Sequence, residues 1–250
     1  MSYVLQTRNL VKKFAGFLVT DRVNLNVAAG ARHALIGPNG AGKTTLINLL
    51  TGFLEPTAGS VLLNGQDVTH RAQHQRVKLG LARTFQINRL FADMTVLESV
   101  TLAVCEQRGI GARFWRPVAA HGEAIDDAAA LLARLRLLDE AHVPTRDLAY
   151  GKQRMVEIAL ALAARPSVLL LDEPAAGVPT AESRELLETI AQLPRDVSIV
   201  LIEHDMDLVF RFADRISVLV SGAILTEGEP AAIAADPRVK EVYLGEAGHA

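Results

Sequence analysis

Eight consecutive residues, Gly37 to Thr44, have the composition and spacing of a phosphate-binding loop. They read Gly-Pro-Asn-Gly-Ala-Gly-Lys-Thr and fit the pattern G-x-x-x-x-G-K-[ST]. Such a loop curls so that successive backbone N–H groups point inward at an anion. Lys43 is expected to reach the β- and γ-phosphates of a nucleoside triphosphate, and Thr44 to place its hydroxyl on Mg²⁺. The expected nucleotide-binding residues are Gly37, Pro38, Asn39, Gly40, Ala41, Gly42, Lys43, Thr44 and Thr45.

The segments on either side of this loop are those that must position it. Residues 31–36 are mostly apolar and predict a buried strand, and residues 45–50 predict a helix with an apolar face. The positive end of that helix would then face the same point as the loop amides. A chance glycine-rich turn is the alternative interpretation, and the strand before the loop and the helix after it favour the phosphate site.

A second candidate for chemistry is the acidic pair Asp172-Glu173, which follows the apolar run from Val168 to Leu171. The pair is expected at the carboxyl edge of a buried strand, where α/β proteins bind their ligands. Asp172 suits a Mg²⁺ ligand, and Glu173 suits a general base that polarises the attacking water. An acidic pair at the end of a strand is common on its own, so this assignment depends on the phosphate loop upstream.

The third candidate is His204, in Glu203-His204-Asp205 after the apolar run of residues 197–202. A lone histidine is more often structural than catalytic. At the edge of the same sheet, however, His204 is expected to sense or stabilise the γ-phosphate.

Composition sets the broad class. With 250 residues, half of them hydrophobic, and a formal charge of -2, the chain suits a globular α/β protein without a nucleic-acid partner. The single cysteine, Cys105, excludes an internal disulfide and fits a reducing compartment. The first six residues lack the features of a signal peptide. The most apolar stretch, residues 158–178, contains charged residues and prolines and is not expected to span a bilayer.

The order of predicted elements suggests a core with an interruption. Residues 3–27 alternate apolar and polar, as in an antiparallel sheet, and residues 61–63 end at the hairpin signal Asn64-Gly65. Residues 87–147 have a helical pattern that is clearest over 123–138. Parallel strands are then expected at 167–171 and 197–202, with a helix between them, and a closing hairpin at 215–226.

These motifs and their spacing resemble the ATP-binding-cassette (ABC) ATPases over essentially the full chain. The resemblance implies an α/β P-loop NTPase (RecA-like) core with an N-terminal antiparallel β-subdomain and an inserted α-helical subdomain. The implied division is residues 1–86 and 160–250 for the core and residues 87–159 for the helical subdomain. It also implies that Phe14 stacks on adenine and that Gln86 contacts Mg²⁺ and the attacking water. Taken singly, Phe14 would be assigned to the core and Gln86 to a solvated loop.

The family signature, which binds the γ-phosphate held by the opposite subunit of a dimer, corresponds to Ala149-Tyr150-Gly151-Lys152. Ala149 replaces a serine whose hydroxyl would bond that phosphate, and Tyr150 replaces a glycine. The loss of one charge-assisted hydrogen bond weakens such a site by about 1.5–3 kcal/mol. Pro179 stands where most of the family has an aspartate, and it offers neither a carboxylate nor an N–H donor.

Three other stretches are similar to the ATPases of branched-chain amino acid importers. They are residues 83–96, residues 173–177 and residues 237–246. The single Gly151 after Tyr150 is similar to one of the two ATPase types in those importers, whereas the other type usually carries Leu-Ser-Gly-Gly. Urea-import and lipopolysaccharide-export ATPases are neighbouring alternatives, and a soluble ABC ATPase outside transport is a competing class.

The resemblance therefore implies an ATP- and Mg²⁺-dependent ATPase at the cytoplasmic face of a bacterial inner membrane. The implied partners are integral membrane permease subunits, a second ABC ATPase subunit in a heterodimer or homodimer, and indirectly a substrate-binding protein. Leu90, Phe91 and Met94 would line the groove that accepts a permease helix, or would be ordinary core residues of the helical subdomain.

Overall fold

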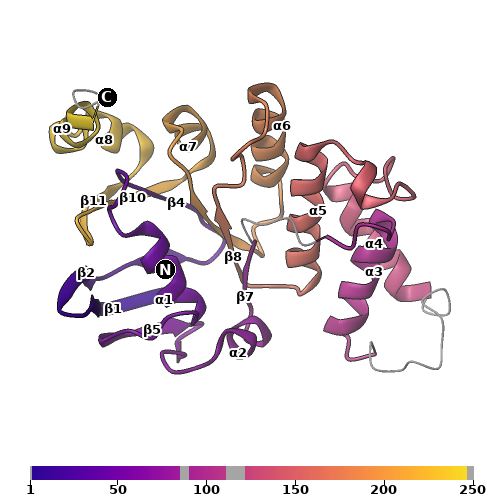
Figure 1. Ribbon diagram of the computed structural model, residues 1–250, viewed down its shortest axis with the longest axis horizontal. Helices are drawn as coiled ribbons and strands as arrows, with labels where there is room; N and C mark the ends of the chain where they lie inside the picture. Colours follow the sequence, from indigo (N-terminus) through magenta and orange to yellow (C-terminus); the bar gives the residue numbers. More distant parts are fainter. Residues whose placement is uncertain (1, 85–89, 111–121, 247–250) are drawn as a thin grey trace. The chain divides into compact units, whose positions relative to one another are not determined.

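The computed structural model describes residues 2–84, 90–110 and 122–246 (Figure 1). The chain divides into two compact units. The first comprises Met1–Leu81, Ser167–Glu173 and Pro194–Ala250, and the second comprises Ala82–Pro166 and Pro174–Leu193. The expected helical subdomain, residues 87–159, falls within the second unit.

An antiparallel sheet opens the first unit, as the alternating pattern of residues 3–27 predicts. Its strand order is β2-β1-β5-β6, with β3 also paired to β1. The strands are β1 (Tyr3–Phe14), β2 (Phe17–Val23), β3 (Asn26–Ala28), β5 (Ala58–Leu63) and β6 (Gln66–Asp67). The hairpin predicted at Asn64-Gly65 joins β5 to β6, and both of its turn residues have positive φ, 50° and 78°.

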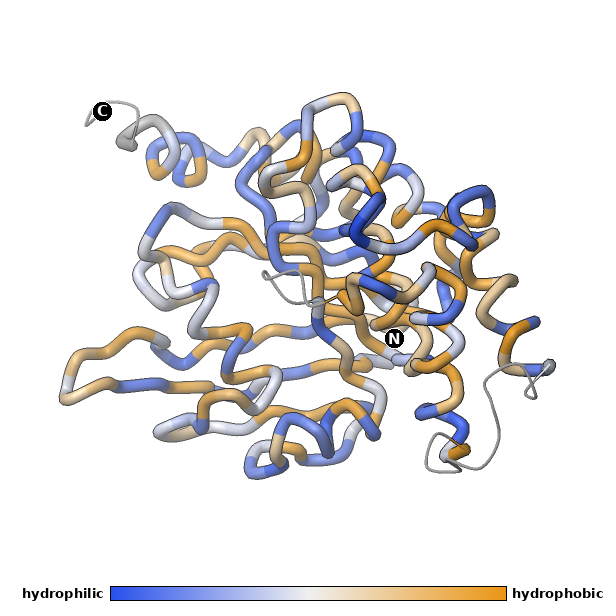
Figure 2. Tube along the Cα trace, turned by 45° about the vertical axis from the view of Figure 1, so that its right-hand side comes forward, coloured by the Kyte–Doolittle hydropathy of each residue, from blue (hydrophilic) through white to orange (hydrophobic). Residues whose placement is uncertain are grey.

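A second, mostly parallel sheet has the order β11-β10-β4-β9-β8-β7. Its strands are β4 (Arg32–Ile36), β7 (Leu81–Arg83), β8 (Val168–Asp172), β9 (Ser198–Ile202), β10 (Arg215–Val220) and β11 (Ala223–Gly228). Every residue of β4, β8 and β9 is buried, as expected of parallel strands covered on both faces. Hydrophobic residues form long stretches along the strands, whereas helices carry both kinds of residue (Figure 2). The closing hairpin at β10–β11 is confirmed.

The helices of the first unit are α1 (Lys43–Thr51), α2 (Gln73–Lys78), α7 (Met206–Phe212), α8 (Pro230–Ala235) and α9 (Pro237–Glu246). The buried side chain of Arg76, on α2, holds the carboxyl end of α1. Its Nη1 donates to the carbonyls of Leu49 and Leu50 at 2.7 and 2.6 Å, and its Nη2 and Nε donate to those of Thr69 and Arg71. A cation is favourable at a helix carboxyl end, so Arg76 fixes the helix whose other end carries the phosphate loop.

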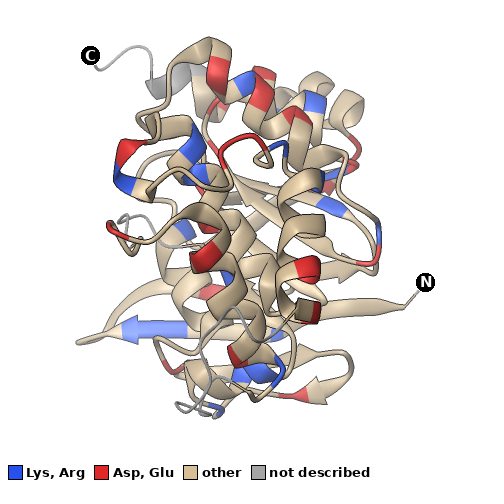
Figure 3. Ribbon diagram, turned by 90° about the vertical axis from the view of Figure 1, so that its right-hand side faces the viewer, with Lys and Arg blue, Asp and Glu red and all other residues tan. Residues whose placement is uncertain are grey.

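Among the described residues, the second unit contains four helices and a short 3₁₀ turn. They are α3 (Val96–Gln107), α4 (Gly122–Arg134), the turn η2 (Thr145–Asp147), α5 (Tyr150–Ala163) and α6 (Thr180–Ala191). A capping box starts α3, where Thr95 Oγ1 accepts from the Glu98 N–H and Glu98 Oε2 accepts from the Thr95 N–H. Helix α3 packs on α4 and α5, and α6 packs on α5. Basic and acidic residues are interspersed along the helices that face the viewer in Figure 3.

The helix predicted over residues 123–138 ends earlier, at Arg134. Arg136 adopts a left-handed conformation with φ of 55°, which no helix can continue. The N–H of Leu137 then bonds back to the carbonyl of Leu132 at 2.9 Å, and the N–H of Arg136 bonds to that of Ala133. This is a Schellman ending built on a non-glycine residue, so the sequence lacks the glycine that normally signals it.

A buried histidine lies inside the parallel sheet. His33, on β4, is fully buried, and its Nε2 lies 2.8 Å from Ser217 Oγ, which in turn donates to Glu227 Oε2 at 2.8 Å. Burial, with a smaller contribution from Arg215, lowers the pKa of His33 to about 4 in spite of the neighbouring Glu227 carboxylate, which raises it. His33 is therefore neutral at pH 7 in the folded chain, with its ring hydrogen directed at Ser217.

We expect the free energy of unfolding to fall as the pH is lowered from about 6.5 to about 4. In that range the unfolded chain binds a proton at His33 and the folded chain does not, so protonation favours unfolding. The full effect of this one group is on the order of 3 kcal/mol. Urea denaturation at a series of pH values should show a flatter dependence for His33→Gln, which cannot titrate, than for the parent. The exposed His70 gives the control, His70→Gln. Equal pH slopes for parent and His33→Gln would contradict this assignment.

Candidate functional site

The carboxyl ends of three neighbouring parallel strands bring the predicted chemical groups to one edge of the sheet. Ile202, the last residue of β9, pairs with Leu35 of β4 on one side and with Asp172 of β8 on the other. The phosphate loop follows β4, the acidic pair ends β8, and Glu203-His204 follows β9. The expectation that these groups share one sheet edge is therefore correct.

The phosphate loop packs so closely against neighbouring backbone that two of its positions require glycine. Gly42 has φ of 98°, and a Cβ there would lie 2.9 Å from the carbonyl oxygen of Val19. A Cβ on Gly37 would collide with the carbonyl oxygen of Leu219. The β10–β11 hairpin also supports the loop, because the N–H of Gly222 donates to the carbonyl of Ala41 at 2.9 Å. The loop is thus wedged between β2 and this hairpin.

Positive charge and backbone donors converge at the amino end of α1. The Lys43 ammonium donates to the carbonyls of Gly37 and Pro38 at 2.6 and 3.0 Å, so it lies over the loop. Gly42 is the N-cap of α1, and no side chain of the described residues caps this end. Thr44, in the first turn, is exposed and Thr45 is half-buried. A helix amino end with a lysine beside it fits a phosphate group.

Glu173 is held in a strained conformation at the end of β8. Its φ is 47°, which costs a non-glycine residue on the order of 1–3 kcal/mol, and its N–H donates to the carbonyl of Ile202 at 2.9 Å. The half-buried Glu173 carboxylate lies 3.6 Å from Nδ1 of His204, whose side chain is exposed. Strained residues cluster at functional sites, and here the strained residue carries the carboxylate predicted to act as the base.

Two further carboxylates belong to the same edge. Asp172 is 4% exposed and ends β8. Glu203 is 2% exposed, and its Oε2 accepts from the N–H of His204 at 3.3 Å, so it orients the turn that carries the histidine. The Thr44 hydroxyl and the Asp172 carboxylate are oxygen donors of the kind that Mg²⁺ prefers when it binds together with phosphate groups. The residues present therefore fit a magnesium–triphosphate ligand.

The structure does not test the predicted roles of two further site residues, Gln86 and Phe14. Gln86, expected to contact Mg²⁺ and the water, lies outside the described residues. Phe14, expected to stack on adenine, ends β1 with 43% of its surface exposed, and the Lys12 ammonium lies 5.1 Å from its ring centroid. An exposed ring is able to stack on a base, and this role of Phe14 stays a prediction.

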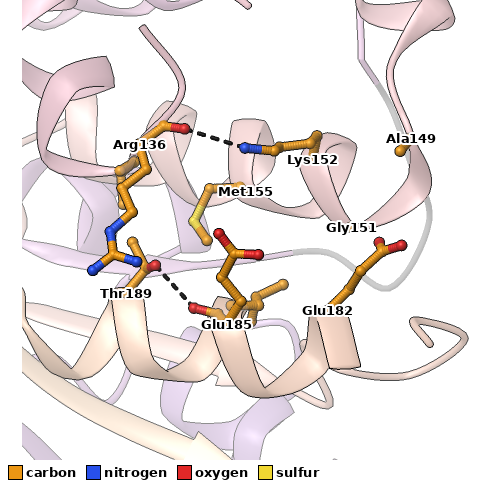
Figure 4. A pocket seen from close by; sticks show the side chains of 10 residues that line it. Arg136, Ala149, Gly151, Lys152, Met155, Glu182, Glu185 and Thr189 are labelled. Atoms are coloured by element: carbon orange, nitrogen blue, oxygen red, sulfur yellow. Dashed lines mark hydrogen bonds between the residues drawn. The ribbon is translucent and has the colours of Figure 1, made fainter. Parts of the chain in front are cut away.

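The signature residues lie in the second unit, at the start of α5. Ala149 is the N-cap and makes no side-chain hydrogen bond, consistent with the loss of the serine hydroxyl. The carboxylate of Glu182, on α6, lies against Gly151: a Cβ built there would be 2.5 Å from Glu182 Oε2 (Figure 4). Lys152 is directed the other way, donating to the carbonyl of Arg136 at 3.2 Å. These residues border a cavity of about 200 Å³ between α5 and α6.

Sequence reasoning missed several residues that shape the site. Arg76 holds the far end of α1, Glu203 orients His204, and Gly222 supports the phosphate loop. Gly222 was expected only as a hairpin turn. Arg76 and Gly222 act through partners distant in the sequence, and no spacing rule connects either residue with its partner. The position of Glu203 directly after the apolar run of β9 is a signal that could have identified it as a buried carboxylate.

Comparisons with known proteins agree with this geometry. The family model described as "ABC transporter" matches residues 20–176, and one described as "Branched-chain amino acid ATP-binding cassette transporter" matches residues 223–249. Over 254 residues, 98% of each chain, the sequence is 43% identical to the high-affinity branched-chain amino acid transport ATP-binding protein LivG of Escherichia coli strain K12.

Two solved structures are similar over most of their length. One is the ADP conformation of an ATP-binding cassette of an ABC transporter, with a TM-score of 0.85 and 31% identity, covering 98% of this chain and 100% of the other. The other is a dimeric ATP-binding cassette in a post-hydrolysis state bound to ADP and Pi. Its TM-score is 0.72 at 25% identity, with 90% and 98% coverage.

We expect Lys43→Ala to weaken ATP binding by about 10- to 100-fold. The substitution removes one charge-assisted hydrogen bond to phosphate, a contribution of about 1.5–3 kcal/mol. Titration calorimetry on the purified variant measures this effect, and Lys78→Ala, at the exposed end of α2, serves as the control. An unchanged affinity in a folded Lys43→Ala protein would show that the phosphates bind elsewhere.

Proposed function

Because this chain belongs to the ABC transporter family, we propose that it is the ATP-hydrolysing subunit of an importer for branched-chain or other hydrophobic amino acids. Family membership carries the ATPase activity. The observation that carries the substrate class is the match of residues 223–249 to branched-chain amino acid cassettes, together with the full-length similarity to LivG.

The chain's own residues account for the binding step. The amides of the phosphate loop and the Lys43 ammonium hold the β- and γ-phosphates at the amino end of α1. Thr44, Asp172 and Gln86 would hold Mg²⁺, which when bound neutralises charge on the phosphate oxygens. Phe14 would stack on the adenine ring.

Hydrolysis needs a base for the attacking water, and Glu173 supplies it. Its carboxylate accepts the proton as the water oxygen bonds to the γ-phosphorus and the bond to the β-phosphate oxygen breaks. His204, 3.6 Å from this carboxylate, is placed to stabilise the γ-phosphate and to position Glu173. The left-handed backbone of Glu173 sets the direction in which its side chain leaves the strand.

The proposed assembly is a dimer of ATPase subunits beneath membrane permease subunits, at the cytoplasmic face of a bacterial inner membrane. No helix within the described residues has the length and apolar character needed to cross a bilayer. A substrate-binding protein would deliver the amino acid to the permease. Phe91, 53% exposed beside the half-buried Leu90 and Met94, supports the proposal that residues 90–94 accept a permease helix.

The proposed domain division follows the family pattern. Residues 1–86 and 160–250 form the ATPase core, and residues 87–159 form the helical subdomain that ends in the signature. Helices α3 and α4 and most of α5 lie within residues 87–159 and support a helical subdomain there.

We expect Glu173→Gln to retain ATP binding and to lower turnover by about 10²- to 10⁴-fold, because glutamine keeps the size of the side chain but accepts no proton. The measurement is ATP-driven uptake of labelled leucine by vesicles that carry the assembled transporter, with ATP hydrolysis followed in parallel. Uptake of leucine by the parent tests the substrate class, and the variant tests the base. Parental hydrolysis by Glu173→Gln would move the role of base elsewhere, with His204 the first residue to examine.

We also expect a heterodimer with unequal sites. In the site that contains this chain's Lys43 and Glu173, a partner with Ser-Gly-Gly in its signature supplies a complete γ-phosphate contact. The other site receives Ala149-Tyr150-Gly151 and is weaker. A Glu→Gln change in each subunit separately should therefore reduce hydrolysis more when it falls on Glu173. Nearly full activity with Glu173 alone changed would contradict the asymmetry.

A further inference from the structure

The aromatic ring in the signature lies against the loop that follows Glu173. Tyr150 is the first residue of α5, and a Cβ built on Gly177 would be 3.3 Å from its Cε1 and 3.7 Å from its Cζ and Oη. Gly177 has φ of 77°, a conformation that favours glycine. The absence of a Cβ at this residue also leaves room for the Tyr150 ring. The two residues belong to the same unit and are separated by 26 positions in the chain.

The loop that receives the ring is closed by its own hydrogen bonds. The N–H of Val178 donates to the carbonyl of Ala175 at 3.1 Å. The hydroxyl of Ser183 donates to the carbonyls of Val178 and Pro179, each at 3.1 Å. Pro179, with its fixed φ, is the N-cap of α6. These hydrogen bonds join residues 175–179 to the first turn of α6.

The ring of Tyr150 also contacts a basic side chain of its own helix. The guanidinium of Arg154, one turn further along α5, lies 5.3 Å from the Tyr150 ring centroid, and it pairs with Glu157 at 3.0 Å. A second contact joins the same two segments, because the Glu182 carboxylate lies against Gly151 (Figure 4). The first turn of α5 and residues 175–183 are thus joined at two points.

We propose that Tyr150 is a positioning residue that couples the two ATP sites of the dimer through Gly177. The inference rests on the proposed dimeric ATPase. The signature that carries Tyr150 serves the ATP held by the partner, whereas the loop at Gly177 begins directly after Glu173, which serves this chain's own ATP. A change at one site reaches the other through the ring.

Two departures from the family pattern fit this role together. Pro179 removes the carboxylate that most of the family has in this loop, and Tyr150 adds a ring that touches the same loop from the signature. Glu173 lies immediately before the loop, and its left-handed backbone donates a hydrogen bond to the carbonyl of Ile202, so a movement of the loop would act on the residue proposed as the base. The coupling acts on the position of the base and leaves the phosphate loop untouched.

The test is a double-mutant cycle of Tyr150→Ala and Gly177→Ala in the assembled transporter. We expect Tyr150→Ala to lower the maximal rate several-fold and to reduce the Hill coefficient for ATP towards 1. ATP affinity of the isolated chain should stay within about twofold of the parent. Tyr150→Phe keeps the ring and should therefore retain the maximal rate and the Hill coefficient of the parent.

Gly177→Ala places a methyl group against the ring and should also lower the rate. Its backbone strain is present in both backgrounds and cancels in the cycle, so non-additivity reports the ring contact alone. Tyr3→Ala, which removes another exposed tyrosine, from β1, is the control. Additive effects of Tyr150→Ala and Gly177→Ala, or a parental Hill coefficient in Tyr150→Ala, would overturn the inference. An assembled parental complex that hydrolyses no ATP would instead contradict the proposed function.

Discussion

The parallel pairing of β4, β9 and β8 is the constraint on which the whole site depends. These strands are buried along their full length, so no polar face helps to set their register, which instead follows from packing and the backbone ladder. Ile202 pairs with Leu35 and with Asp172 in one row. A shift of one residue in either pairing would turn every side chain of the strand to the opposite face and move Asp172 away from the phosphate loop.

Local strain at this edge is supported by long-range backbone contacts. Glu173 and the glycines of the phosphate loop take conformations that a free chain would rarely adopt. Their partners are the carbonyl of Ile202, the β10–β11 hairpin under Ala41 and the carbonyl of Val19 beside Gly42. Arg76 adds a clamp at the far end of α1. Contacts between distant segments therefore stabilise a site that is locally unfavourable.

The features that could be predicted from the sequence are those that a local sequence pattern determines. The phosphate loop, the acidic pair after an apolar strand and the hairpin at Asn64-Gly65 each have a short-range physical signal, and the structure places all three as predicted. Contacts between distant segments have no such signal. The left-handed Arg136 that ends α4 has none either, because arginine rarely adopts this conformation and only its surroundings select it. The ring of Tyr150 on Gly177 belongs with these long-range contacts.

Two independent features would weaken phosphate binding at the proposed signature of this chain. Ala149 offers no hydroxyl at the N-cap of α5, so one donor to the γ-phosphate is missing. The Glu182 carboxylate at Gly151 places a negative charge at the same helix end. There it stabilises α5 through the helix dipole and repels an incoming phosphate. In the proposed heterodimer, the same carboxylate that stabilises the folded subunit would weaken the site to which this signature contributes, and a partner with a Ser-Gly-Gly signature would make the other site the stronger one.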